Sequence, residues 1–158
     1  KILGLDGINR IECYDISNTS GSLAASSMVV FANGEPDKSQ YRRFRIRSRN
    51  SPNDPLMIGE TIQRRLNHLD DWGKPELFVI DGGATQLMAA KIALAEADCK
   101  IPVISLAKRE EEIYLQPDLK ISLPRTSPAL QLVQRMRDEA HRFSRRYHLL
   151  LRTKKMLS

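Results

Sequence analysis

Apolar and polar positions alternate along the first third of the chain in a way that predicts β-strands. Strands are expected over 10–16 and 23–31, where apolar side chains recur at short spacing and a polar turn separates the two runs. Asn33 and Gly34 form a dipeptide that is typical of a tight hairpin. A third strand is expected over 41–47, where arginines alternate with aromatic and aliphatic residues. This part of the chain is therefore predicted to form an antiparallel meander.

Beyond the third strand, helical patterns alternate with short apolar runs. The elements expected there are a helix over 55–69, a buried strand over 77–80, a helix over 85–97, a strand over 101–106, a hairpin over 110–123 and a final helix. The final helix follows Ser127-Pro128, and its apolar stripe is expected to continue to Leu150 and Leu151. This order predicts an α/β fold, a mixed sheet flanked by helices, and it matches the ribonuclease H architecture.

Size and composition set limits on this fold. The chain has 158 residues and 41% hydrophobic content, which predicts a single domain over 1–158. Because the chain starts at Lys1 without a methionine, we expect a fragment of a larger multidomain protein.

No run approaches the roughly 18–20 apolar residues of a membrane span and no leader is evident, so we expect a cytoplasmic protein without a membrane partner. Cys13 and Cys99 lack metal-site spacing and are expected to be buried thiols.

Positive charge is concentrated in two places. The formal net charge is +6, and the segment 130–158 alone contains eight Lys or Arg residues against two acidic ones. The second cluster lies in the predicted third strand and comprises Arg42, Arg43, Arg45, Arg47 and Arg49. Arginine favours phosphate contacts because its guanidinium matches the phosphate oxygens, and each neutralised phosphate releases counterions. Either cluster alone fits a solvated surface, but together they favour a nucleic-acid partner.

Two aspartates and one histidine are the candidates for chemistry. Asp15 lies within an apolar strand, where a carboxylate is costly unless it is paired or bound to a cation. Asp81 ends an apolar run, at the edge where open α/β sheets bind ligands, although Asp before Gly-Gly also fits a simple turn or helix cap. His141 lies at the margin of the apolar stripe of the final helix, where a structural hydrogen-bonding group fits as well as a ligand. Two carboxylates and an imidazole suit Mg²⁺ or Mn²⁺ acting on a phosphodiester.

Several short strings of residues resemble one known family. They are Arg-Ile-Glu-Cys-Tyr-Asp-Ile-Ser (10–17), Tyr-Arg-Arg-Phe (41–44), Val-Ile-Asp-Gly-Gly (79–83), Gln-Leu (86–87), Leu-Ala-Lys (106–108) and Arg-Asp-Glu-Ala-His-Arg-Phe (137–143). In this order, and over nearly the whole chain, they resemble the C-terminal endonuclease domains of the UvrC family, which acts in bacterial nucleotide excision repair. The resemblance implies a ribonuclease H-like domain that cuts the damaged strand on the 5′ side of a lesion.

The resemblance also implies roles for individual residues. The metal-binding set of the family corresponds to Asp15, Asp81 and His141. Asp54 matches the second aspartate of a Gly-Asp-Asp string in the family, and it fits the N-cap of the expected helix equally well. We expect five basic residues to position phosphates, namely Arg42, Arg43, Lys108, Arg137 and Arg142. The implied partners are damaged double-stranded DNA and, through the full-length protein, UvrB and indirectly UvrA.

Two other functions fit parts of the pattern. The family usually has histidine at the position of Asn18 and lysine at the position of Ala84, so the chain also fits a DNA-binding or repair-scaffold module with weak or lost catalysis. Another ribonuclease H-like enzyme, such as an endonuclease V relative or a resolvase, shares the acidic pair. The string over 137–143 argues against that second alternative.

Overall fold

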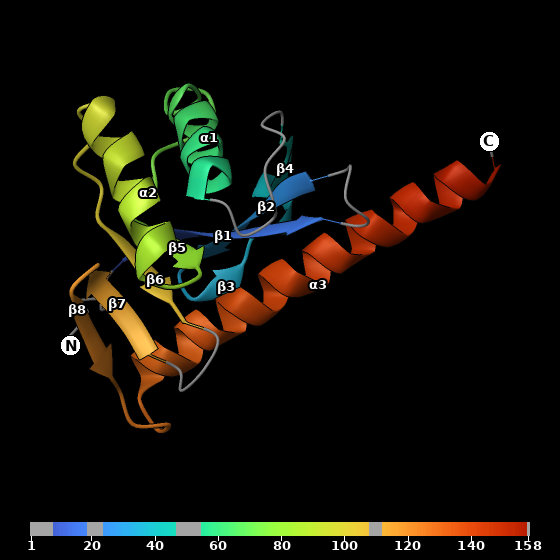
Figure 1. Cartoon of the computed structure of the whole chain (residues 1–158). Coiled ribbons are helices and arrows are strands. Elements are labelled where there is room, and N and C mark those ends of the chain that lie inside the picture. The colour runs from blue at the N-terminus through green and yellow to red at the C-terminus, as the bar shows by residue number, and fades with distance from the viewer. Residues whose placement is uncertain (1–7, 19–23, 47–54, 108–111, 158) are drawn as a thin grey trace.

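The computed structural model describes residues 8–18, 24–46, 55–107 and 112–157. Within these residues, eight strands form one sheet, and helices cover both of its faces (Figure 1). The strands are β1 (Arg10–Asn18), β2 (Ala24–Ala32), β3 (Glu35–Pro36), β4 (Arg42–Arg45), β5 (Leu77–Asp81), β6 (Val103–Leu106), β7 (Glu112–Gln116) and β8 (Leu119–Ser122). The helices are η1 (Lys38–Gln40, a 3-10 turn), α1 (Pro55–Leu66), α2 (Ala84–Glu96) and α3 (Pro128–Leu157).

The sheet combines parallel and antiparallel pairing, as the sequence predicted. Its strand order is β3-β2-β1-β5-β6-β7-β8, and β4 also pairs with β2. The pairs β1/β5 and β5/β6 are parallel, and the other described pairs are antiparallel. The expected hairpin at Asn33-Gly34 is confirmed, because both residues have positive φ (53° and 82°), as a tight turn of this kind requires. Element ends differ from the predicted ones by up to three residues, since helix and strand ends are only weakly specified by local sequence.

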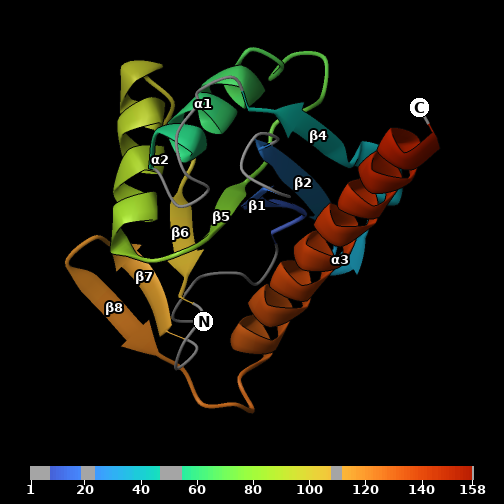
Figure 2. The ribbon, with the colours of Figure 1, turned by 45° about the vertical axis from the view of Figure 1, so that its right-hand side comes forward.

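Each face of the sheet has its own apolar core, because successive side chains of a strand point to opposite faces. On the α3 face, Cys13 and Val79 pack with Met136 and other residues of the helix stripe. On the opposite face, Tyr14 and Phe78 pack beneath α1 and α2. Figure 2 shows α1 and α2 together on one side of the sheet and α3 alone on the other. The face to which a strand side chain points therefore decides which of the two apolar cores, and which helices, it contacts.

The predicted apolar stripe of α3 is too long. The stripe is buried as far as Ala140, but Leu149 and Leu150 are exposed, with 61% and 57% of their surface accessible. The reason is that α3 continues past the edge of the sheet, so its last turns have no strand beneath them (Figure 1). The prediction that both cysteines are buried is also only half right, since Cys13 is buried and Cys99 is partly exposed.

A buried ion pair joins β1 to α1 on the face opposite α3. The Arg65 guanidinium donates to both oxygens of Glu12, at 2.8 and 2.7 Å, and neither side chain is accessible to solvent. The Tyr14 hydroxyl donates to the same carboxylate at 2.6 Å. The burial of Arg65 could have been predicted from the sequence. It continues the helical spacing of Ile58 and Ile62 on the buried side of α1.

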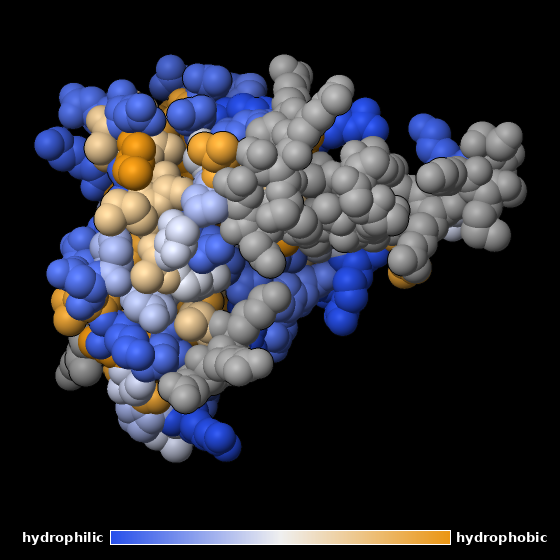
Figure 3. Space-filling model, viewed as in Figure 1, coloured by the Kyte–Doolittle hydropathy of each residue, from blue (hydrophilic) through white to orange (hydrophobic). Residues whose placement is uncertain are grey.

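A shallow apolar groove runs between α1 and α2, on the face of the sheet away from α3. Its volume is about 540 Å³, and Leu56, Met88 and Ile92 are among the side chains that line it. Figure 3 shows the apolar surface over these two helices in orange and tan. None of the helices in the described ranges has the length and apolar character needed to cross a membrane.

Candidate metal centre

The parallel pairing of β1 and β5 sets the two aspartates side by side. The register runs from Ile11 opposite Leu77 to Tyr14 opposite Ile80, so the next position along places Asp15 beside Asp81. Both side chains belong to the face that α3 covers, because they follow the alternation that puts Cys13 on that face. Two carboxylates far apart in the sequence therefore meet at one edge of the sheet.

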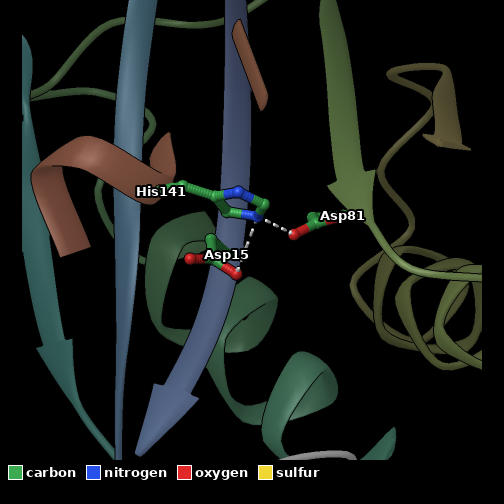
Figure 4. A group of neighbouring side chains, drawn as sticks. All are labelled: Asp15, Asp81 and His141. Atoms are coloured by element: carbon green, nitrogen blue, oxygen red, sulfur yellow. Dashed lines mark hydrogen bonds and ion pairs between the residues drawn. The ribbon is translucent and has the colours of Figure 1, made fainter. Parts of the chain in front are cut away.

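His141 reaches this pair from α3. It follows Ala140, the last buried apolar residue among the described side chains of the helix. Its Nε2 lies 2.6 Å from Oδ2 of Asp81, where the imidazole N–H donates, and 4.0 Å from Oδ1 of Asp15. Figure 4 shows the imidazole directed from the helix toward both carboxylates. Strands β1 and β5 and helix α3 thus each contribute one side chain to the same point.

The two carboxylates are more buried than the imidazole. The side chains of Asp81, Asp15 and His141 have 2%, 11% and 34% of their surface exposed. The hydrogen bond to Asp81 raises the pKa of His141, and this effect outweighs partial burial, which lowers that pKa. The site is therefore open mainly on the side of the imidazole, and its negative charge favours a positively charged neighbour.

The three residues fit a divalent cation. One ligand atom from each of Asp15, Asp81 and His141 lies within 4.8 Å of the other two. Oδ1 of Asp81 is buried and has no hydrogen-bond partner among the described residues, which is costly for a carboxylate oxygen unless a cation satisfies it. Burial first, and then the charges of Asp81 and Asp15, raise the pKa of the nearby Cys13 thiol well above its usual range. Two oxygens and one nitrogen suit Mg²⁺ or Mn²⁺.

The alternative role of Asp81 as a turn or cap residue is not what the geometry shows. The N-cap of α2 is Gly83, whose N–H donates to Oε1 of Gln86 at 3.1 Å. Gly82 has φ of +157°, and a Cβ there would lie 2.8 Å from Cγ of Gln86. The two glycines therefore allow β5 to turn sharply into α2, while the side chain of Asp81 remains directed at His141.

The basic residues that the sequence singled out have different surroundings. Arg137 is mostly buried one helical turn before His141 and also contacts Asp138 at 3.2 Å. Arg43 lies in the same cross-strand row as Asp15, because both pair with Ser27 of β2.

Two of these residues are held by neighbours. Arg42 donates to the backbone oxygens of Ser39 and Tyr41 at 3.3 and 2.9 Å, and Arg142 donates twice to Glu139. Lys108 and Asp54, together with the side chain of Asn18, lie outside the described residues. The structure thus places Arg43 in the same row as Asp15 and Arg137 one helical turn before His141.

Comparison with known proteins identifies relatives. A family model described as the UvrC RNase H endonuclease domain matches residues 1–144. UvrABC system protein C of Methanosarcina mazei is 47% identical over 153 residues, which cover 94% of this chain and 29% of that protein. UvrABC system protein C of Dehalococcoides mccartyi strain CBDB1 is 49% identical over 158 residues, which cover 94% of this chain and 26% of that protein. This chain therefore spans less than a third of the length of these relatives.

A solved structure shows the same fold. Endonuclease V of Ciona intestinalis, in complex with inosine-containing DNA, aligns with a TM-score of 0.50 and 19% identity over 66% of this chain and 48% of that chain. At this identity the likeness concerns the fold alone, and it confirms the predicted ribonuclease H-like architecture. It does not favour the endonuclease V alternative over the much stronger sequence match. The family match and the two relatives together show that this chain belongs to the family of UvrC RNase H endonuclease domains.

Proposed function

We propose that this chain is a metal-dependent DNA endonuclease domain that hydrolyses a phosphodiester on the 5′ side of a lesion during nucleotide excision repair. The observation that carries the proposal is the meeting of three ligand atoms within 4.8 Å, beside a buried Asp81 oxygen that has no hydrogen-bond partner in the described part of the chain. Membership of the UvrC family supports the nuclease part of the proposal. The metal, the DNA substrate and the position of the cut are the proposed parts.

Asp15, Asp81 and His141 are the residues that would hold Mg²⁺ or Mn²⁺. The cation would polarise the phosphodiester, lower the pKa of a bound water and stabilise the leaving oxygen. Asp81, the most buried of the three, provides a carboxylate oxygen that is already desolvated and oriented. His141 can bind through Nε2 only when that nitrogen carries no proton, so its hydrogen bond to Asp81 would be given up when a cation binds.

The basic residues around this centre are proposed to position DNA phosphates. Arg43, in the row of Asp15, and Arg137, one turn before His141, would contact phosphates beside the one being cut, and Arg42, Arg142 and Lys108 would bind other phosphates of the strand. Arg142 and Arg42 are engaged within the protein, so each exchanges an existing partner for a phosphate. Asp54 is proposed as a further acidic residue of the site.

The proposed partners belong to the longer protein. Damaged double-stranded DNA is the substrate, and loading on the lesion would depend on UvrB, and indirectly on UvrA, through segments beyond this chain. The name shared by the relatives, UvrABC system protein C, supports an assembly of this kind.

The test uses the full-length protein that contains this domain, with a duplex that carries one lesion and separate labels for the 5′ and 3′ cuts. Asp15→Ala and Asp81→Ala should each abolish 5′ incision while binding of the duplex persists. The 3′ cut, which we assign to a separate nuclease domain, is the internal control for correct loading. Normal 5′ incision by either variant would refute the assignment.

A second candidate function, a DNA-binding module without catalysis, is favoured by the residue at position 84. Ala84 begins α2 directly after the Asp81-Gly82-Gly83 turn, where the family pattern has lysine, so a positive charge is missing beside the centre. A DNA-binding module with lost catalysis would show salt-sensitive DNA binding by the unaltered protein and no 5′ incision with Mn²⁺. Such a result would replace the nuclease proposal.

A further inference from the structure

The apolar packing that fixes α3 on the sheet ends where the candidate metal centre begins. The buried apolar residues of the helix are Leu130, Val133, Met136 and Ala140, all of which lie before His141. The last turns of α3 run past the sheet edge (Figure 1). His141 therefore comes directly after the last fully buried apolar residue of α3, and the helix keeps contacts beyond it through the buried Ser144 and through Phe143, which packs against the core.

A second set of contacts holds α3 at this same turn. The hydroxyl of Tyr41, just before β4, donates to Oε2 of Glu139 at 2.7 Å. The ring of Tyr41 also packs edge-on against Phe143, with the centroids 5.0 Å apart and the planes at 68°. Glu139 and Phe143 are one helical turn apart and lie on either side of His141 in the sequence, so Tyr41 contacts α3 both below and above the histidine.

Two arginines strengthen this contact. Arg142 donates to both oxygens of Glu139, at 2.7 and 2.8 Å, and the guanidinium of Arg43 lies 3.9 Å from the centroid of Phe143. Hydrogen bonding from Arg142 lowers the pKa of Glu139. Burial, together with the bond to Glu139, raises the pKa of Tyr41. The tyrosine hydroxyl thus donates to a carboxylate that Arg142 also holds.

The geometry of the helix couples the two sides of α3. Successive residues are rotated by about 100°, so Glu139 and His141 project in well-separated directions, one toward β4 and the other toward β5. A rotation of about 20° moves a group about 5–6 Å from the helix axis by about 2 Å. That displacement is enough to break the 2.6 Å hydrogen bond between His141 and Asp81. The hydrogen bond between Tyr41 and Glu139 opposes this rotation, in addition to the apolar packing of the helix.

We propose that Tyr41 and Glu139 are positioning residues, which fix the rotation of α3 so that His141 meets Asp15 and Asp81 in ligand geometry. Neither residue touches the proposed cation or the DNA phosphate being cut. The proposal rests on the proposed function, because holding His141 in place matters for cation binding. The contacts of Tyr41 with α3 are nevertheless present in the metal-free chain and can be tested there. Tyr41 acts through His141, so its effect on cation binding should disappear when His141 is removed.

The experiment is a double-mutant cycle on the 158-residue chain with Mn²⁺ as the probe, measured by calorimetric titration. Tyr41→Phe keeps the ring contact with Phe143 and removes only the hydroxyl. It should weaken Mn²⁺ binding about threefold to tenfold, less than the tenfold to hundredfold typical of groups bonded directly to a ligand. In a His141→Ala background, Tyr41→Phe should cause no further loss. Tyr114→Phe in β7 makes the same chemical change away from the centre and should leave Mn²⁺ affinity unchanged.

A metal-free measurement separates this proposal from the proposed function. The imidazole N–H that His141 donates to Asp81 should give a downfield proton signal in ¹H–¹⁵N spectra of the chain. Tyr41→Phe should shift or broaden that signal, and Glu139→Gln, which keeps an acceptor for Tyr41, should affect it less than Glu139→Leu. If the chain binds no Mn²⁺, the proposed metal centre fails while this signal still decides the role of Tyr41.

Two results would overturn the positioning role. An unchanged imidazole signal in Tyr41→Phe would show that α3 is held without the hydroxyl. An equal loss of Mn²⁺ affinity in the wild-type and His141→Ala backgrounds would show a general loosening that does not act through the histidine.

Discussion

Replacing Asp81 by asparagine should stabilise the metal-free chain and destroy its response to metal. The perturbation is nearly isosteric, because Oδ of asparagine can still accept the hydrogen bond from His141. What it removes is the repulsion between Asp81 and Asp15, whose ligand atoms lie within 4.8 Å of each other. When the asparagine oxygen accepts from His141, its NH₂ group takes the place of the buried Oδ1 of Asp81. That group is a hydrogen-bond donor and suits the neighbouring carboxylate of Asp15.

The magnitude follows from the distance and the surroundings. Two unit charges separated by 4.8 Å repel by about 3.5 kcal/mol at an effective dielectric constant of about 20. Charge spread over two oxygens and water at the open side of the site reduce this, so we expect a gain of about 1–2 kcal/mol in the free energy of unfolding. The raised pKa of His141 gives the pH dependence. A protonated imidazole compensates the repulsion, so the gain should be larger above that pKa than below it.

Metal reverses the order of stability. A cation at one hundred times its dissociation constant stabilises a folded protein by about 2.7 kcal/mol. For a chain of this size, 1 kcal/mol shifts the unfolding temperature by about 2–4 °C. In EDTA at about pH 8.5, Asp81→Asn should therefore unfold about 2–8 °C above the wild type. With saturating Mg²⁺ the wild type should gain about 5–11 °C and the variant almost nothing.

The assay is thermal unfolding followed by circular dichroism, in EDTA and in Mg²⁺ at matched ionic strength. Asp98→Asn is the matched control, because Asp98 is exposed and has φ of 53°, a conformation that asparagine tolerates. It should change the unfolding temperature little and respond to Mg²⁺ as the wild type does. Lower stability of Asp81→Asn in EDTA, or an equal response of both proteins to Mg²⁺, would refute the reasoning.

Three further predictions concern the surroundings of the centre. Glu12→Ala leaves the buried guanidinium of Arg65 without its carboxylate and should cost about 3–5 kcal/mol in urea unfolding; a loss below about 1 kcal/mol would contradict the buried ion pair. Gly82→Ala places a Cβ 2.8 Å from a neighbouring side chain and should cost about 1–3 kcal/mol by the same measurement, whereas a neutral effect would show that the turn relaxes. Hydrogen bonding from Arg142 lowers the pKa of Glu139, so this carboxylate stabilises the fold above its ordinary pKa and the contribution is lost as the pH falls through the lowered value. Wild type should therefore lose more stability than Glu139→Gln between about pH 5 and pH 3, and parallel pH profiles would exclude this contribution.

Local pattern was sufficient for most elements of the fold, because strand alternation and helical spacing directly reflect which side chains are buried. The pairing of Asp15 with Asp81 was also within reach, since right-handed crossover implies parallel neighbours with their carboxyl ends at one edge. The contact of His141 with Asp81 was not, because it depends on where along the sheet α3 lies and how it is rotated. Likewise, the overestimated stripe at Leu150 arose because helical spacing does not reveal where the sheet beneath a helix ends.

The long-range partners of polar and charged residues could not be predicted from the sequence either. Tyr41 and Glu139 meet although nearly a hundred positions separate them, and neither has a local pattern that identifies the other. The sequence predicts that Arg142 binds a phosphate. In the structure it is paired with Glu139 one turn away, a spacing at which a helix often pairs opposite charges. Charge clusters thus predict the class of partner better than they predict which arginine is available to it.

The division of the centre among β1, β5 and α3 has a consequence for the protein as it is synthesised. The ribosome adds the residues between Asp81 and His141 in about 3–12 s at usual elongation rates. During that interval the nascent chain holds both aspartates but not His141, because α3 has not yet been synthesised. Truncated chains that end before α3 therefore carry the two aspartates without His141 and, under the proposed function, lack one of the three proposed metal ligands.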